Sequence, residues 1–395
     1  MRTLVWTLIA GICALIGGLG MTGVANKPLL PKTPPSQSAY QKTPSEKLFI
    51  IPYGEAPNQI YLESPEGSGE GENIWAIVPL TFRVLHDGNL VIVGGRHKHL
   101  TAQLFDLRGQ LVRFTEYEHA RSLDNELVDI GVDGRLYICR RLLMQDLQHT
   151  FQTEQDRPSP NQLLFIGNLD GTTNRNLRDK LQSDLYKVVE SNKFEMLGID
   201  LVVSNTADVF VSLCSPLQAG EPCHYQLVRL HPLENPKLLS APPGMPAVRL
   251  YDGSIGYLQY KVSEKQQVAS GVKILREDGT ILAEFEIPDS VYKKGNLILG
   301  DGGSPDPVLV RADRLVLLLQ DDSLQSDGSR KNLVTVNGIP IYPYSLVVLD
   351  SSGAVVFEES FGAIGMQRLC DTDGKGNLYY LNFTKEGFEV RRVSF

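Results

Sequence analysis

Hydrophobic residues between positions 48 and 395 fall into short runs, and polar turn residues separate these runs. Clear examples lie at 90–93, 136–138, 209–213, 315–319 and 346–349, and Asp-Gly, Asn-Gly or Ser-Gly pairs punctuate the chain. Short runs rich in β-branched and aromatic residues, bounded by such turns, are typical of β-strands. The pattern therefore predicts an all-β sandwich, barrel or propeller.

One segment has a helical pattern instead. Leu177, Leu181, Leu185 and Val188 recur at the spacing of one helix face. Asn176 stands before the first turn and has a side chain suited to capping it. We therefore expect one amphipathic helix, with Asn176 as its cap.

Turns recur in pairs along the chain. A first turn, followed by an apolar strand, stands at 87–88, 133–134, 207–208, 252–253, 312–313 and 373–374. A second turn, preceded by a similar strand, stands at 108–109, 170–171, 234–235, 278–279, 352–353 and 386–387. Repeats of about 40–50 residues mark propeller blades, so six turn pairs predict a six-bladed β-propeller of four-stranded blades with degenerate repeats. A tandem of β-sandwiches is the alternative.

The last repeat is one strand short. After the turn at 386–387 only the strand at 388–395 remains, whereas segment 47–53 (KLFIIPY) precedes the first complete repeat. An open ring would expose unpaired backbone groups at a strand edge. We therefore expect this N-terminal strand, through residues 49–51, to complete the last blade and close the ring.

Composition narrows the class of protein. The 395 residues are 42% hydrophobic and 21% charged, which excludes a disordered chain. The length alone suggests two or three domains, but a propeller accommodates residues 48–395 in one. The net charge is −8, and without residues 1–25, whose only charge is Arg2, it is one unit more negative. An acidic chain argues against nucleic acid or anionic lipid as the main partner.

The N-terminus predicts export. Residues 1–25 combine Arg2, an uncharged run rich in Leu, Ile, Ala and Gly, and a small-residue end, which is the layout of a signal peptide. The run at 3–25 is also long enough for an uncleaved signal anchor, a single membrane pass. Residues 26–47 are rich in Pro and predict an extended linker. Both alternatives place the propeller in the periplasm, at the cell surface or in the medium.

A resemblance supports the same architecture. The stretches YGEAPNQIYLE, IVPLTFRVLHDGNLVIVGG and AQLFDLRGQLVRF resemble an opening blade of exported bacterial six-bladed β-propellers of the NHL-like type. In weaker form the resemblance extends over residues 48–395. It departs at GGRHKHLTAQ, where better-defined repeats carry Asp, Asn and Arg between the second and third strands. The resemblance therefore implies the architecture and no particular ligand.

Four cysteines follow the export segment. Cys214 and Cys223 bracket a loop that contains Pro and Gly, and in an oxidising compartment we expect them to form a disulfide. Two reduced thiols are the alternative. Cys139 and Cys370 fall in different blades, and we expect both to be buried as small apolar residues.

Two cationic groups are the candidate binding residues. Arg96, His97 and His99 lie close together, and in an extended strand the two histidines point the same way, towards a metal or an anion. Arg140 and Arg141 head a long insertion and could face the central channel. Solvated loops are the alternative for both groups. With no third ligand identifiable we expect no metal site and no cofactor.

Segment 371–377 partly matches a calcium-binding loop. However, Lys375 and Asn382 stand where acidic ligands are expected, which favours a simple turn. There is no G-x-S-x-G or H-E-x-x-H motif. No catalytic residue is therefore identified.

The sequence favours a non-catalytic binding or scaffold propeller, a monomer whose loop face takes a protein, peptide or glycan at the cell envelope. The alternative is a metal-dependent hydrolase or lyase with acidic, Asn or His ligands in the central channel. A structural component of an envelope assembly, contacting partners through insertions at 141–160 and 321–344, is a third hypothesis.

Overall fold

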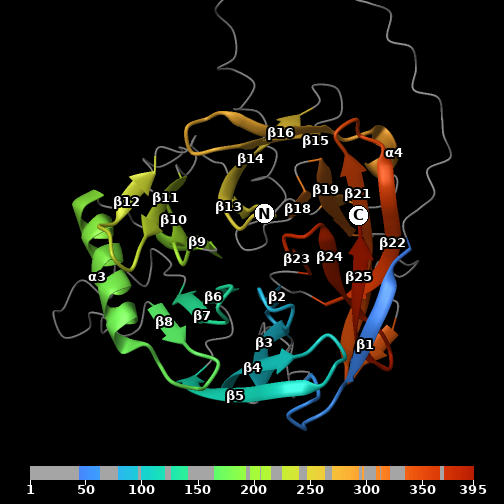
Figure 1. Ribbon diagram of the computed structural model, residues 1–395, viewed down its shortest axis with the longest axis horizontal. Helices are drawn as coiled ribbons and strands as arrows, with labels where there is room; N and C mark the ends of the chain where they lie inside the picture. The colour runs from blue at the N-terminus through green and yellow to red at the C-terminus, as the bar shows by residue number, and fades with distance from the viewer. Residues whose placement is uncertain are drawn as a thin grey trace, which may run out of the picture.

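Six small antiparallel sheets form a closed ring (Figure 1). The computed structural model describes residues 44–62, 79–96, 99–120, 126–140, 164–192, 196–204, 206–214, 225–239, 247–262, 269–292, 296–297, 308–311, 313–320, 334–364 and 369–395. The predicted six-bladed β-propeller is confirmed, and the tandem of sandwiches is excluded.

The first three blades follow the chain in order. Blade 1 contains β2 (Thr81–Val84), β3 (Leu90–Arg96), β4 (His99–Phe105) and β5 (Leu111–Ala120). Blade 2 contains β6 (Glu126–Ile130), β7 (Leu136–Arg140) and β8 (Leu164–Gly167). Blade 3 contains β9 (Met196–Val203), β10 (Val209–Cys214), β11 (Tyr225–Leu230) and β12 (Lys237–Leu239).

The other three blades complete the circle. Blade 4 contains β13 (Ala247–Arg249), β14 (Ile255–Val262), β15 (Ala269–Leu275) and β16 (Ile281–Glu286), and the short helix α4 (Asp289–Tyr292) follows it. Blade 5 contains β17 (Asn296–Leu297), β18 (Val308–Arg311), β19 (Arg314–Gln320), β20 (Val334–Val336), β21 (Ile339–Asp350) and β22 (Val355–Ala363). Blade 6 contains β23 (Cys370–Thr372), β24 (Asn377–Phe383), β25 (Gly387–Ser394) and β1 (Glu46–Pro52).

The innermost strands surround the axis of the ring. Neighbouring inner strands contact one another all the way round, in the order β2, β6, β9, β13, β18, β23 and back to β2. Within each blade the inner strand pairs antiparallel with the second strand, and in blades 1, 2, 3, 4 and 6 the turns that join these two strands lie at the same end of the ring. We call this end the turn face and the opposite end the loop face.

The predicted turns form for a local reason. In the turn between β2 and β3, the Asp87 carboxylate accepts the Asn89 N–H at 2.9 Å, and Gly88 takes φ 85°, a value that favours glycine. Two expectations need correction. The turn at 170–171 leads into a helix rather than a strand, and the turn at 386–387 joins β24 to β25 at the loop face, so it is not the last turn of its blade.

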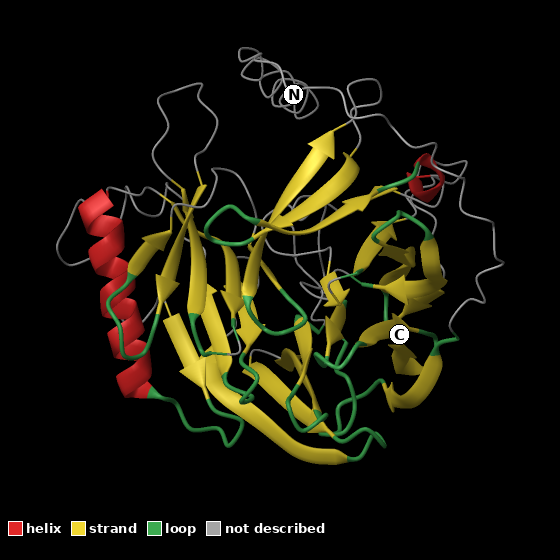
Figure 2. Cartoon of the chain, turned by 45° about the horizontal axis from the view of Figure 1, so that its top comes forward, coloured by secondary structure: helices red, strands yellow, loops and turns green. Residues whose placement is uncertain are grey.

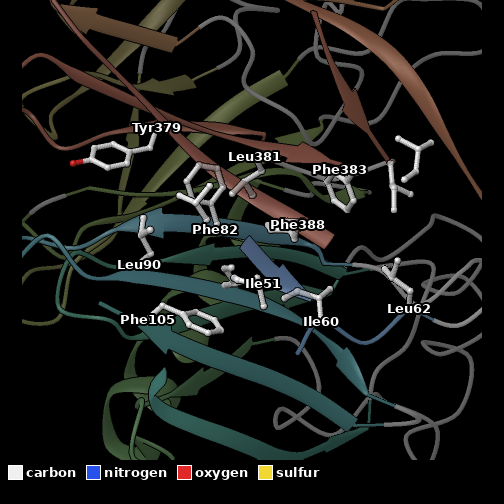
Figure 3. Close-up of a cluster of buried hydrophobic side chains, with 14 of the residues drawn as sticks. Ile51, Ile60, Leu62, Phe82, Leu90, Phe105, Tyr379, Leu381, Phe383 and Phe388 are labelled. Atoms are coloured by element: carbon white, nitrogen blue, oxygen red, sulfur yellow. The ribbon is translucent and has the colours of Figure 1, made fainter. Parts of the chain in front are cut away.

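β1 closes the ring as predicted. It pairs antiparallel with β25, with Phe49 opposite Val390 and Ile51 opposite Phe388. Ile51 is 1% exposed and lies in a hydrophobic cluster between the last and first blades, where Figure 3 shows it beside Phe388. The edge of the third strand of blade 6 is therefore covered by the N-terminal strand.

The predicted helix also forms, as α3 (Arg175–Asn192), on the outside of blades 2 and 3 (Figures 1 and 2). Its buried residues pack on a cluster shared by both blades. The Gln182 side chain accepts the Leu164 N–H of β8 at 3.2 Å, so α3 stands where the other blades have a fourth strand. The expected cap was wrong: Asn174, not Asn176, accepts the Leu177 N–H, at 3.1 Å.

The cysteines divide between described and undescribed parts of the chain. Cys139 and Cys370 are both buried, in separate hydrophobic clusters. Cys214 ends β10, whereas Cys223 lies outside the described residues, so their disulfide stays a prediction. The export segment and most of the linker, residues 1–43, also lie outside them. Within the described ranges, no helix combines the length and the apolar character that a membrane span requires.

Candidate functional site

Four charged side chains meet at the axis of the ring. Arg83, Asp129, Arg249 and Asp371 come from the inner strands β2, β6, β13 and β23. Arg249 donates through Nη2 to both carboxylate oxygens of Asp129, at 2.8 and 2.9 Å, and its Nη1 lies 3.8 Å from Asp371 Oδ1. The side chains of Arg249, Asp129 and Asp371 are at most 8% exposed.

Backbone groups complete this axial network. Asp129 accepts the N–H groups of Ile130 at 2.8 Å and Val203 at 2.7 Å. Asp371 accepts the Val84 N–H at 2.9 Å. The buried Arg83 guanidinium donates to the carbonyl oxygens of Ile130 and Val203. The network therefore connects blades 1, 2, 3, 4 and 6.

The axial network holds equal numbers of opposite charges, since two carboxylates face two guanidinium groups. A general base or a metal ligand must present lone pairs to the substrate or ion. Asp129 accepts three protein N–H donors, from Ile130, Val203 and Arg249, whereas Asp371 accepts one, at Oδ2, and also lines a cavity at the turn face. Among the described residues, no three His, Cys, Asp or Glu side chains form a group that could hold a metal ion.

A cavity of about 240 Å³ opens above the axial network at the turn face. We call it the axial pocket. The turns that follow the inner strands of blades 1, 4 and 6 provide most of its lining: Arg83, Val84, Leu85, His86, Val132, Arg249, Leu250, Tyr251, Asp252, Gly253, Asp371, Thr372, Asp373, Gly374 and Lys375. His86 and Lys375 are exposed at its rim, and Tyr251 is half-buried.

A second cavity, of about 320 Å³, lies between blades 3 and 4, and we call it the interblade pocket. It shares Asp252 and Gly253 with the axial pocket, so the two cavities adjoin. Arg229 pairs with Asp208 at 2.8 Å. Tyr257 also lines the interblade pocket. Burial, and to a lesser extent the Glu277 carboxylate, raises the pKa of Tyr257 to about 12, so its phenol stays neutral.

The sequence-predicted cationic residues belong to the other end of the ring. Arg96 ends β3 and pairs in register with His99, the exposed first residue of β4. Arg140 ends β7, also at the loop face. His97 and Arg141 lie outside the described residues. The hairpin thus brings Arg96 and His99 together, on the face opposite the axial pocket.

Segment 371–377 spans the end of β23, the turn at 373–376 and the first residue of β24. Asp373 accepts the Lys375 N–H at 2.8 Å, and Asn382 Oδ1 accepts the Gly362 N–H at 2.9 Å. The oxygens that a calcium-binding loop would offer to the ion therefore accept protein N–H groups instead. Of the two insertions, residues 141–160 and 321–333 lie outside the described ranges, and the remaining part forms β20 and the start of β21.

The sequence analysis missed the axial network. A usable signal was present: one charged residue interrupts each apolar run before a first turn, as in TFRVLHDG, LVDIGVDG and AVRLYDG. A single charge within a buried inner strand needs a partner, because an unpaired buried charge is very costly.

Comparison with known proteins gives no family. No protein-family model and no curated protein matches the chain. Among solved structures it is similar to virginiamycin B lyase from Staphylococcus aureus, with 11% identity over 85% of this chain and 100% of that one and a TM-score of 0.33. The polysaccharide lyase Uly1 shows 10% identity over 89% and 88%, with a TM-score of 0.36. A putative gluconolactonase shows 15% identity over 71% and 92%, with a TM-score of 0.26.

These scores assign no activity to this chain. The strand pairing described above defines the protein as a six-bladed β-propeller.

Proposed function

We propose that this protein is an exported, non-catalytic propeller of the NHL-like type that binds a protein, peptide or glycan at the cell envelope. One observation carries the proposal: at the axis Asp129 pairs with Arg249, and both Asp129 and Asp371 accept backbone N–H groups. Polar groups open to a partner lie instead at the two ends of the ring, in turns and loops. Such surfaces suit binding, since a rigid scaffold positions them.

Three features of the sequence support export. Residues 1–25 have the layout of a signal peptide or signal anchor, and a Pro-rich linker separates them from the ring. The spacing of Cys214 and Cys223 suits a disulfide, which an oxidising compartment would preserve.

The acidic net charge disfavours nucleic acid as the partner.

The hydrolase or lyase alternative requires acidic, Asn or His ligands converging at the axis. Asp129 and Asp371 do converge there, but both face Arg249, and the described part of the chain contains no group of three His, Cys, Asp or Glu side chains that could hold a metal ion. We therefore propose one function.

Two measurements test the proposal. A fusion of residues 1–47 to alkaline phosphatase should be active in a bacterial host, because this enzyme folds only after export; an inactive fusion would contradict export. Immobilised protein should retain a component of an envelope extract and release it with unaltered mass. Conversion of that component to a product, abolished in Asp371→Asn, would show that the channel is catalytic.

A further inference from the structure

We propose that the axial and interblade pockets form one groove that binds an uncharged oligosaccharide. The inference rests on the proposed binding function and deepens it, because it names the ligand class and the site. It places the ligand at the turn face, whereas the cationic residues of the sequence analysis lie at the loop face.

The two cavities adjoin. They share Asp252 and Gly253, and together they run from the axis of the ring to the boundary of blades 3 and 4. Their volumes of about 240 and 320 Å³ are at or below the lower end, roughly 300 Å³, of pockets that hold small ligands. A ligand that fills both must therefore be a chain that runs through the groove.

Charges of both signs line the groove. In the axial pocket, three carboxylates (Asp252, Asp371 and Asp373) face three cations (Arg83, Arg249 and Lys375). The interblade pocket adds two carboxylates, Asp208 and Glu277, and one cation, Arg229, so the groove as a whole has five carboxylates and four cations. Arg229 pairs with Asp208, and Lys237, which lies outside the lining, pairs with Glu277 at 2.7 Å. An anion would meet carboxylates along the whole path and a cation would meet ammonium and guanidinium groups, so each gains on one side what it loses on the other.

Hydroxyl groups match such a mixed lining. Each hydroxyl donates one hydrogen bond and accepts others, so it can bind a carboxylate or a cation equally. The lining also includes the hydroxyls of Ser204, Thr206 and Ser254. Thr206 donates to Asp208 and Ser254 to Asp252, both at 2.6 Å, so these two hydroxyl oxygens offer lone pairs to a ligand. The half-buried ring of Tyr251 supplies an aromatic surface for the apolar face of a sugar ring.

A peptide fits this groove less well. One common way for an extended peptide to bind is to add to an open strand edge. The backbone along the groove is already paired: β13 with β14, Gly253 N–H with the Leu250 carbonyl, and Leu250 N–H with the Ser254 carbonyl. The groove therefore presents side chains rather than a strand edge.

The experiment is a calorimetric titration of the full protein with short neutral oligosaccharides, uronic-acid oligosaccharides and unstructured peptides. A neutral oligosaccharide should bind, and Tyr251→Ala and Lys375→Ala should each weaken binding about tenfold, which corresponds to ~1.4 kcal/mol. Lys385→Ala is the matched control, because Lys385 is an exposed lysine in a turn of the same blade at the loop face. It should leave affinity unchanged.

Thermal melting separates loss of the site from loss of the fold. Lys375 is exposed, so Lys375→Ala should melt like the wild type and tests the site even where Tyr251→Ala is unstable. Binding only to acidic sugars or peptides would overturn the inference. So would neutral-sugar binding that both variants keep.

The two proposals fail in different ways. If oligosaccharide binding survives at the turn-face variants but is lost in Arg96→Ala and His99→Ala, the binding function stands and the groove does not. If no sugar binds but an envelope protein does, the ligand class is wrong and the function stands. If neither binds, both proposals fall.

Discussion

At the residue scale, the buried charges at the axis are the least ordinary feature of this propeller. A buried ion pair rarely adds much net stability, but removing one partner leaves the other charge without compensation. Arg249 contacts two carboxylates on different blades, so the axial network fixes how these blades meet. It could not be predicted from sequence spacing, because Asp129 and Arg249 are 120 residues apart.

Replacing Asp129 with Asn should therefore destabilise the folded protein. We expect Asp129→Asn to lower the free energy of unfolding by about 3–5 kcal/mol, the usual cost of breaking a buried pair. Asp133→Asn is the matched control in the same blade: its pair with Arg135 is solvent-exposed, and its loss should cost less than about 1 kcal/mol. Chemical denaturation measures both values. Equal losses would show that the axial pair has no special role.

The Cys139 thiol should be inert in the folded protein. It is fully buried, and burial raises its pKa to about 12, so almost no reactive thiolate exists at mildly alkaline pH. Iodoacetamide should label Cys139 only after denaturation, as site-resolved mass spectrometry would show. The same experiment tests the predicted disulfide, because Cys214 and Cys223 should need a reductant before they react. Rapid labelling of Cys139 in native protein would contradict its burial.

At the scale of elements, local chemistry explains which predictions succeeded. These turns form through contacts within a few residues, so the first turns at 87–88, 133–134, 207–208, 252–253 and 373–374 were correctly predicted from sequence. Residue 312 of the turn predicted at 312–313 lies outside the described residues. The helix cap was misplaced because asparagine occurs at both 174 and 176, and tertiary contacts choose between them. The Asn174 N–H donates to the Ile166 carbonyl at 3.1 Å, which holds the chain in place up to residue 174 and lets the helix begin only after it.

The two asparagines provide a direct test of the cap. Asn174→Ala should lower the free energy of unfolding by about 1 kcal/mol, the typical value for loss of an N-cap. Asn176→Ala, at an exposed position inside the first turn, should be close to neutral. Thermal melts of the two variants measure the difference. A larger loss in Asn176→Ala would restore the cap expected from the sequence.

The closing strand β1 can be tested in a similar way. Ile51 is buried against blade 1, whereas its neighbour Ile50 is half-buried. Ile51→Ala should lower the free energy of unfolding by about 2–5 kcal/mol, as for other buried isoleucines, and Ile50→Ala by clearly less. Denaturant titration compares them. If both changes are equally mild, β1 contributes little to ring closure.

At the scale of the whole molecule, the sequence predicts the ring but not the proposed binding groove. The count of strands predicted the architecture and its closure, because a missing last strand and a spare first strand imply each other. The groove could not be predicted, since its lining joins turns of blades 1, 4 and 6 that only the ring brings together. The cationic residues that stood out in the sequence mark the opposite face.

Binding in the groove can be tested by hydrogen–deuterium exchange of the full protein, with and without the neutral oligosaccharide that binds it most tightly. We expect slower exchange in the turn-face segments 85–89, 250–255 and 372–377, and unchanged exchange in the β3–β4 hairpin around Arg96 and His99. Protection confined to that hairpin, or absent from all three turns, would contradict it.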